Sequence, residues 1–273
     1  MRLMKNSVNL FLKMKNSKIE KILKKKGKDP ICCLTAYSKN IAAILDKYCD
    51  IILVGDSLGM VLYGMKSTKE INIDTMILHA KAVKKHSKKS IVVFDMPYRT
   101  YTNKILAYKN ALKVIKKTKC DAIKLEGGKK IANIVKYLVK KGIPVMGHIG
   151  LLPQHSKKYK VQGKKLIQKK EILNDAKKLY ESGVFAVVIE CVLENLARKI
   201  TKEIPIPTIG IGASKHCDGQ ILVSDDMLGM SNYYPKFVKK YSSISRIIEK
   251  SVKAYCQEVK LKKFPSRKHV YIN

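Results

Sequence analysis

The sequence predicts an α/β protein of the (β/α)8, or TIM-barrel, class: a single domain preceded by an N-terminal helical extension. Three observations lead to this prediction. Short apolar runs alternate with amphipathic stretches of helix length, eight such runs are present, and the chain has 273 residues, close to the ~250 typical of this barrel. Alternating strands and helices indicate parallel strands joined by crossover helices.

Each predicted strand is a short apolar run bounded by Gly, Pro or Asp. The runs are CCLTAY (32–37), IILVGD (51–56), IVVFDMP (91–97), AIKLEG (122–127), PVMGHIG (144–150), AVVIEC (186–191), PTIGIGA (207–213) and QILVSD (220–225). An open doubly wound sheet is the alternative, and it requires a GxGxxG phosphate loop after its first strand. The chain has LTAYSKN at that place, so the closed barrel is favoured.

The segments between the strands are predicted to be helices, because their apolar residues recur at helical spacing. The predicted ranges are 75–87, 104–118, 130–142, 169–183 and 194–204, with further helix in 237–260. Two of the ranges end at a glycine stop signal, Gly142 and Gly183. The predicted organisation is therefore an extension at 1–15, a catalytic barrel at 16–262 and a basic tail at 263–273.

The charge of the chain raises a different function class. Lys and Arg number 56 against 21 Asp and Glu, which gives a formal net charge of +35 and is typical of proteins that bind nucleic acid or anionic membranes. Specific DNA readers rely on arginine forks, and arginine occurs here only at Arg2, Arg99, Arg198, Arg246 and Arg267. Since the lysines are scattered over predicted helices, we expect a solvated basic surface and no specific nucleic-acid partner.

Cysteine usage and hydropathy indicate the compartment. The seven cysteines contain no CxxC pair, which favours free thiols in a reducing environment over a disulfide framework or a zinc site. No apolar run approaches the ~18 residues that a membrane span needs. We therefore expect a cytoplasmic protein with no membrane partner.

Polar residues stand where the predicted strands end, and in a barrel these positions face the mouth of the active site. They are Asp56, Ser57, Asp95, Lys124, Glu126, His148 and Glu190. Strand residues alternate between two faces, so Lys124 and Glu126 are predicted to point inward together. The same alternation assigns Asp56 to one face with Ile52 and Val54, and groups Asp95 and Glu190 with their own inward residues.

Four carboxylates, one lysine and one imidazole at one end of a barrel predict a cation site, because like charges so crowded need a counter-charge. Oxygen ligands without paired cysteines favour Mg²⁺. Such a site suits a 2-oxo acid bound through its ketone and carboxylate oxygens, with the ion stabilising an enolate. Glu190, distant from the other carboxylates in sequence, is the predicted base.

Each of these residues also has an ordinary structural explanation. Asp56 alone is consistent with a helix cap, Lys124 and Glu126 with a buried ion pair, and His148 with a core histidine. Capping alone does not account for five successive strands that all carry such groups at the same end. Their joint occurrence therefore favours a functional site.

The chain also resembles the ketopantoate (3-methyl-2-oxobutanoate) hydroxymethyltransferase family over roughly residues 16 to 260. The motifs, in order, are LTAY, ILVGDSLGMVLYG, DMPY, IKLEGG, IPVMGHIGLLPQ, KVQGK, IECV, IPTIGIGAS and CDGQILVSDDMLG. The resemblance implies a (β/α)8 barrel that transfers a one-carbon unit from 5,10-methylenetetrahydrofolate to 3-methyl-2-oxobutanoate. The product would be 2-dehydropantoate, on the route to pantothenate and coenzyme A.

The resemblance also implies roles for particular residues. Asp56 and Asp95 would be Mg²⁺ ligands with Glu126 in the metal's shell, one ion per subunit, and Glu190 would be the proton acceptor. The residues implied to bind the oxo acid are Asp56, Ser57, Asp95, Lys124 and His148. The family's assembly implies a homodecamer.

A Mg²⁺-dependent lyase of 2-oxo or 2-hydroxy acids, related to isocitrate lyase and phosphoenolpyruvate mutase, is the alternative enzyme class. Such enzymes carry a cysteine-bearing flexible loop of the KKCGH kind, and this sequence has no such segment. A lyase would also act without folate, so a requirement for folate separates the two classes.

Overall fold

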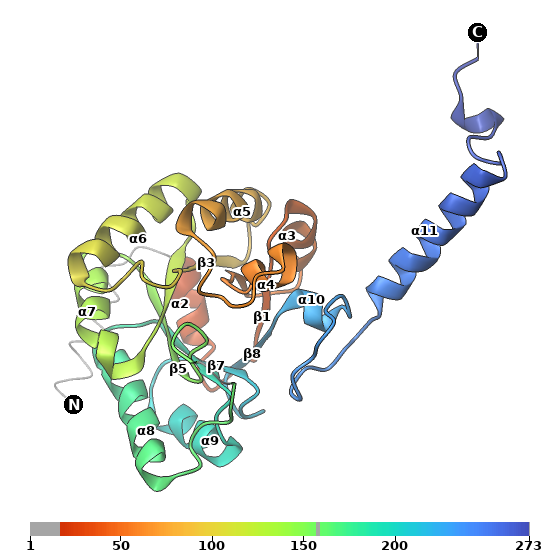
Figure 1. Cartoon of the computed structure of the whole chain (residues 1–273). Coiled ribbons are helices and arrows are strands. Elements are labelled where there is room, and N and C mark those ends of the chain that lie inside the picture. Colours follow the sequence, from red (N-terminus) through yellow and green to blue (C-terminus); the bar gives the residue numbers. More distant parts are fainter. Residues whose placement is uncertain (1–16, 157–158, 273) are drawn as a thin grey trace. The chain divides into compact units, whose positions relative to one another are not determined.

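Eight parallel strands close into a barrel in the order β1 to β8, which confirms the predicted fold class (Figure 1). The computed structural model describes residues 17–156 and 159–272. The strands are β1 (Ile31–Thr35), β2 (Ile51–Val54), β3 (Ile91–Asp95), β4 (Ala122–Glu126), β5 (Val145–Gly150), β6 (Ala186–Glu190), β7 (Thr208–Ile211) and β8 (Gly219–Leu222). All eight predicted runs form strands.

The strands are apolar on both faces because each lies between the barrel interior and the surrounding helices. Side chains that fill the interior form one cluster, which includes Cys33, Ile51, Leu53, Ile91, Val93, Ala122, Met146, Val188 and Ile209. Side chains that face the helices form another, which includes Ile52, Val54, Val92, Phe94, Ile123, Leu125, Val187 and Ile189. The two clusters follow the alternation of the strand residues.

Helices surround the barrel (Figure 1). They are α3 (Lys39–Leu45), α4 (Leu58–Tyr63), α5 (Ile73–Lys85), α6 (Lys104–Thr118), α7 (Ala132–Lys140), α8 (Leu166–Glu181) and α9 (Glu194–Glu203). α5 to α9 overlap the five ranges predicted between the strands, whereas α3 and α4 were not predicted. α5 and α6 begin where Asn72 and Asn103 accept hydrogen bonds from backbone N–H groups of the first turn. The alternation breaks once, because residues 212–218 join β7 to β8 without a helix.

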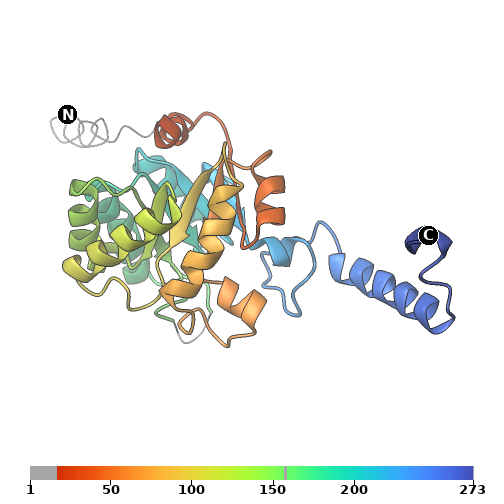
Figure 2. The ribbon, with the colours of Figure 1, turned by 90° about the horizontal axis from the view of Figure 1, so that it is seen from above.

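A helix before the first strand closes the amino-terminal end of the barrel. This helix, α2 (Ser17–Lys24), buries Ile19 and Ile22 against Ile31, Ile51 and the rest of the interior cluster. Figure 2 shows α2 at one end of the barrel and α4, which follows β2, at the other. The carboxyl ends of the strands therefore lie at the end opposite α2. The extension predicted at 1–15 lies outside the described residues.

The chain divides into two compact units between Val223 and Ser224. The first contains the barrel, and the second contains α10 (Ser224–Met227), α11 (Ile244–Lys260) and a short 3-10 helix (Arg267–His269). The helix predicted in 237–260 thus begins at Ile244. The domain boundaries placed after residues 15 and 262 from sequence stay predictions. Within residues 17–156 and 159–272, every helix is too short or too polar to cross a membrane.

Candidate active site

The charged residues at the ends of β3, β4 and β5 lie side by side in the barrel mouth. Asp95 is opposite Lys124 across the β3–β4 pair, and Glu126 is opposite His148 across the β4–β5 pair. All four are buried, and each follows interior residues at alternating positions of its strand. The inward direction predicted for Lys124 and Glu126 therefore agrees with the structure, since Ile123 and Leu125 face the helices.

Asp56 also lies in the barrel mouth, but a turn after β2 places it there and not the alternation of the strand residues. The assignment of Ile52 and Val54 to the interior face with Asp56 is wrong, because both face the helices while Ile51 and Leu53 fill the interior. β2 ends at Val54, and the chain then turns through Gly55. This turn brings the backbone N–H of Asp56 to 3.4 Å from Asp95 Oδ2 and buries its carboxyl group.

Lys124 is the central cation of the mouth. Its Nζ donates to both carboxylate oxygens of Asp95, at 2.7 and 2.8 Å, and lies 3.6 Å from Glu126 Oε1. Burial alone lowers the pKa of a lysine, but the carboxylates of Asp95, Glu126 and Asp56 outweigh it and raise the pKa of Lys124 above its usual value. Lys124 therefore stays charged and holds Asp95 in one orientation.

His148 stands between two carboxylates. Its Nδ1 is 3.3 Å from Glu126 Oε1 and its Nε2 is 3.2 Å from Glu190 Oε2, although neither ring nitrogen is aligned for a hydrogen bond. Burial and Lys124 lower the pKa of His148, but attraction to Glu126 and Glu190 raises it to about 9. Burial raises the pKa of Glu126, yet His148 and Lys124 bring it down to about 2. Glu126 and His148 thus form a buried ion pair at neutral pH.

Glu190 is the most accessible carboxylate of the group. Its side chain is 16% exposed, against 2% for Glu126 and His148. Gly150 allows this placement, because it has φ +90° and a Cβ there would lie 2.3 Å from the backbone oxygen of Glu190. The end of β6 therefore lies tightly against β5 while the carboxylate reaches toward the opening.

Three uncharged residues complete the site, and the sequence did not single them out as site residues. Tyr37 shares a hydrogen bond of 2.8 Å with Ser57 through their hydroxyl groups. Gln154 donates from Nε2 to Asp56 Oδ2 at 2.8 Å, and its Oε1 accepts from the hydroxyl of Tyr101. The motifs LTAY and GLLPQ, which contain Tyr37 and Gln154, were the available signal.

The donor set fits a hard divalent cation. Burial, followed by repulsion from Asp95 and Glu126, raises the pKa of Asp56 well above its usual value, so a bound cation would stabilise its ionised form. In residues 17–156 and 159–272 no group of three or more His, Cys, Asp or Glu side chains is placed so that it could hold a metal ion by itself. Mg²⁺ is commonly held by one or two carboxylates with water and substrate filling its other positions. Asp56 and Asp95 fit such an open site, and their role as ligands stays a prediction.

Comparison with known proteins shows to which family the chain belongs. The model of the ketopantoate hydroxymethyltransferase family matches residues 16–267. The chain belongs to this family. A 3-methyl-2-oxobutanoate hydroxymethyltransferase of Pelagibacter ubique is 53% identical over 256 residues, which are 94% of this chain and all of that protein. One of Anaplasma marginale (strain Florida) is 52% identical over 90% of each chain.

Solved structures agree on the fold of this family member. A phosphonopyruvate hydrolase, solved with oxalate and Mg²⁺, has a TM-score of 0.60 and 10% identity over 93% of each chain. A 2,3-dimethylmalate lyase of the PEP mutase/isocitrate lyase superfamily has a TM-score of 0.61 and 10% identity, over 93% of this chain and 88% of that one. At such low identity, the likeness to these structures supports the barrel fold alone. The family membership of the chain favours the hydroxymethyltransferase class over the lyase alternative.

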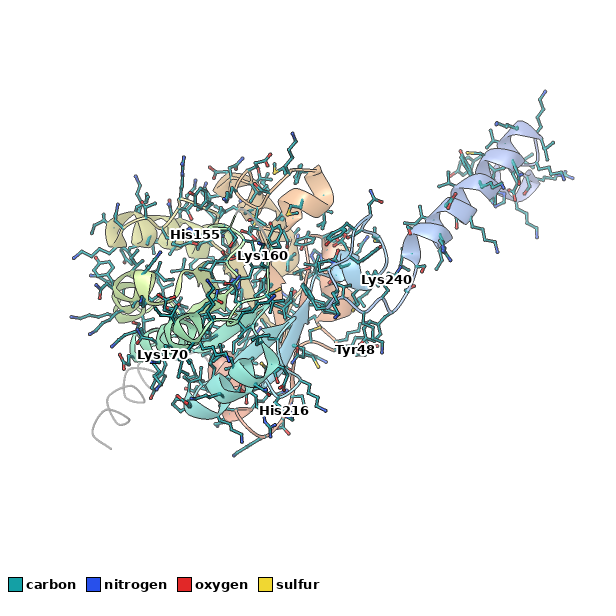
Figure 3. All side chains as sticks on the ribbon, turned by 60° about the horizontal axis from the view of Figure 1, so that its bottom comes forward. Tyr48, His155, Lys160, Lys170, His216 and Lys240 are labelled. Carbon is teal, nitrogen blue, oxygen red and sulfur yellow. The ribbon has the colours of Figure 1, made fainter. Side chains whose placement is uncertain are left out.

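The basic residues of this chain are spread over separate segments. Lys160 lies on the loop before α8 and Lys170 on α8 itself, and both are exposed (Figure 3). Many other lysines are exposed on the outer helices, as their positions in the sequence predict.

Proposed function

We propose that this chain transfers a hydroxymethyl group from 5,10-methylenetetrahydrofolate to 3-methyl-2-oxobutanoate, with Mg²⁺ as cofactor. The product is 2-dehydropantoate, an intermediate of pantothenate and coenzyme A biosynthesis. Relatives about half identical in sequence carry the name of this transferase. The structural observation that carries the proposal is one accessible carboxylate, Glu190, beside a buried group of carboxylates and cations.

The buried group binds and orients the oxo acid in this proposal. Lys124 supplies positive charge to the substrate's oxygens, and Ser57, held by Tyr37, donates a hydrogen bond to them. Asp56 and Asp95 hold the cation, and Glu126 lies beside it. A bound Mg²⁺ supplies Lewis-acid stabilisation of the negative charge that develops on the ketone oxygen.

Glu190 accepts the proton from C3 of the oxo acid. His148 holds the Glu190 carboxylate from one side, with Nε2 at 3.2 Å, and leaves its other side to the substrate. The electron pair of the broken C–H bond forms the new bond to the one-carbon unit. Over the whole reaction both C–N bonds of the methylene bridge break. Water supplies the hydroxyl group and one proton to the folate nitrogens, and the proton held on Glu190 supplies the other.

The proposal is tested in two steps. Purified protein with Mg²⁺, the oxo acid and 5,10-methylenetetrahydrofolate is expected to form 2-dehydropantoate, detected by mass spectrometry. In D₂O without folate, NMR is expected to show exchange of the C3 proton, because proton removal precedes transfer. Glu190→Gln is expected to lose both, whereas Glu181→Gln, on the exposed surface of α8, keeps both. The absence of product from the unaltered chain would refute the transferase.

We further infer that the protein is a homo-oligomer, with the decamer of its family as the expected size. The second unit supports this inference, because α11 buries none of its side chains within that unit. Its exposed apolar residues include Ile247, Ile248, Val252 and Tyr255. A cytoplasmic location and the absence of a specific nucleic-acid partner stay predictions. Sedimentation of the purified protein and a salt titration of nucleic-acid binding test two of these points.

A further inference from the structure

Gln154 connects the ends of several strands through its side chain and its backbone N–H. It follows β5, is fully buried, and precedes the exposed His155, which is labelled in Figure 3. Its backbone N–H donates to Glu126 Oε2 at 3.1 Å, at the end of β4. Its Nε2 donates to Asp56 Oδ2 at 2.8 Å and to the backbone oxygen of Met96, which follows β3, at 3.0 Å. One residue thus contacts groups that follow or end β2, β3 and β4.

Tyr101 fixes the direction of the Gln154 amide. The Tyr101 hydroxyl is buried and donates to Gln154 Oε1, while it accepts from the backbone N–H of Glu126 at 3.4 Å. Because both neighbours of Nε2 are acceptors and the neighbour of Oε1 is a donor, the amide has one satisfied orientation. A flipped amide would place its oxygen against a carboxylate and a carbonyl, and both contacts would be repulsive.

The group that donates a side-chain hydrogen bond to Asp56 is neutral, unlike the group beside Asp95 and Glu126. Asp95 and Glu126 each have the ammonium of Lys124 within 4 Å. Asp56, by contrast, receives its side-chain hydrogen bond from the neutral amide of Gln154. A neutral donor orients the carboxyl group of Asp56 without adding a positive charge beside it, so a divalent cation bound there would not meet a competing cation on this residue.

We propose that the Gln154 side chain, locked by Tyr101, is a positioning group that presents the carboxylate of Asp56 to the divalent cation of this site. The inference rests on the proposed function, because it takes the cation to be bound by Asp56. Gln154 acts through the carboxylate of Asp56 and touches neither the substrate nor the reacting atoms. Its loss is therefore expected to change cation affinity first and turnover as a consequence.

The test measures cation binding directly, with Mn²⁺ as a spectroscopic substitute for Mg²⁺. Free Mn²⁺ is counted by electron paramagnetic resonance in the full chain without substrates. Gln154→Met, which keeps the length of the side chain, is expected to raise the Mn²⁺ dissociation constant by about 10- to 100-fold. Tyr101→Phe is expected to raise it by less, because the Gln154 amide keeps its own donors to Asp56.

A double variant and a matched control separate positioning from general destabilisation. In the Gln154→Met background, Tyr101→Phe is expected to add less than it does alone, because the tyrosine acts through the amide. Phe185→Leu removes bulk from the buried interior next to the start of β6. It is expected to lower the unfolding midpoint while leaving the Mn²⁺ dissociation constant within about two-fold, since distant sites act independently.

Three results would overturn the inference. They are unchanged Mn²⁺ affinity in Gln154→Met, an equal loss of affinity in Phe185→Leu, and no Mn²⁺ or Mg²⁺ binding by the unaltered chain. If Gln154→Met does not fold, unchanged affinity in Tyr101→Phe overturns it instead. Failure of the proposed function looks different, because there the unaltered chain binds Mn²⁺ with the expected dependence on Gln154 but forms no 2-dehydropantoate.

Discussion

Replacement of Lys124 by methionine tests the balance of charge in the barrel mouth. Methionine keeps most of the length of the side chain and removes the ammonium group, so the change leaves packing nearly intact. It deletes two hydrogen bonds of 2.7 and 2.8 Å to Asp95 and a charge contact of 3.6 Å to Glu126. The carboxylates that remain are buried, so water cannot replace the lost cation.

The expected loss of unfolding free energy in Lys124→Met follows from these contacts. Hydrogen bonds to charged groups contribute about 1.5–3 kcal/mol each, and removal of one partner from a buried ion pair costs about 3–5 kcal/mol. We therefore expect a loss of about 3–5 kcal/mol in the presence of a chelator. Added Mg²⁺ is expected to reduce the difference from the unaltered chain, because the freed carboxylates bind the cation more tightly.

Urea unfolding followed by circular dichroism measures both quantities. Lys113→Met is the matched control, because Lys113 pairs with Asp74 at 2.7 Å on the surface, where the side chains are 34% and 66% exposed. An exposed pair of this kind contributes little to stability, because water and salt screen the two charges. The reasoning is refuted if Lys124→Met costs no more than Lys113→Met in the chelator.

Three further changes test other parts of the structure. Gly150→Ala is expected to cost about 1–3 kcal/mol in a thermal melt, because it adds a Cβ 2.3 Å from a backbone oxygen at φ +90°; Gly27→Ala, also at positive φ but in open space, should cost clearly less. Asp46 accepts from the backbone N–H groups of residues 88–90, and these bonds outweigh burial and lower its pKa below 3.8. Asp46 therefore stabilises the folded state fully above pH ~4, and this stabilisation is lost as the pH falls through the folded-state pKa. The loss of unfolding free energy in Asp46→Asn, measured by urea unfolding, should therefore shrink in acid. A loss independent of pH would contradict this expectation. Burial raises the pKa of Cys191 to about 12, so at pH 8 iodoacetamide should alkylate Cys191 far more slowly than the exposed Cys32. Mass-spectrometric mapping measures both rates, and equal rates would count against this expectation.

The fold and the charged part of the site were predictable because both depend on local periodicity. Alternation along AIKLE determines that Lys124 and Glu126 share a face, and the parallel register then places Glu126 beside His148. A residue pattern with period two contains this information without any knowledge of distant contacts. The same applies to α6, whose bounds of Lys104–Thr118 match the predicted range.

Periodicity gives the wrong answer where a strand ends. Asp56 was grouped with Ile52 and Val54 on the assumption that β2 continues, but the strand ends at Val54 and the chain turns at Gly55. Asp56 still reaches the mouth, because the turn replaces the alternation. Likewise, the missing helix between β7 and β8 could not be inferred from a count of strands.

Uncharged site residues escape sequence reasoning for another reason. Gln154 and Tyr101 are separated by 53 positions, and each is ordinary in its own segment. Their importance arises only when the closed barrel brings them to Asp56 and Glu126. Charged residues in buried strands attract attention because burial of a charge is costly, whereas a buried amide or phenol gives no such warning.

The alternation of charge and hydrocarbon along β4 also determines which genetic changes the strand tolerates. Apolar substitutions that conserve side-chain volume at the buried Ile123 or Leu125 usually cost less than about 1.5 kcal/mol. Deletion of one codon before Lys124 would instead rotate every later side chain of the strand to the opposite side, with the ammonium and carboxylate among the helices and the aliphatic residues in the catalytic opening. Length variation in evolving members of this lineage is therefore expected in the connecting loops and not within β4.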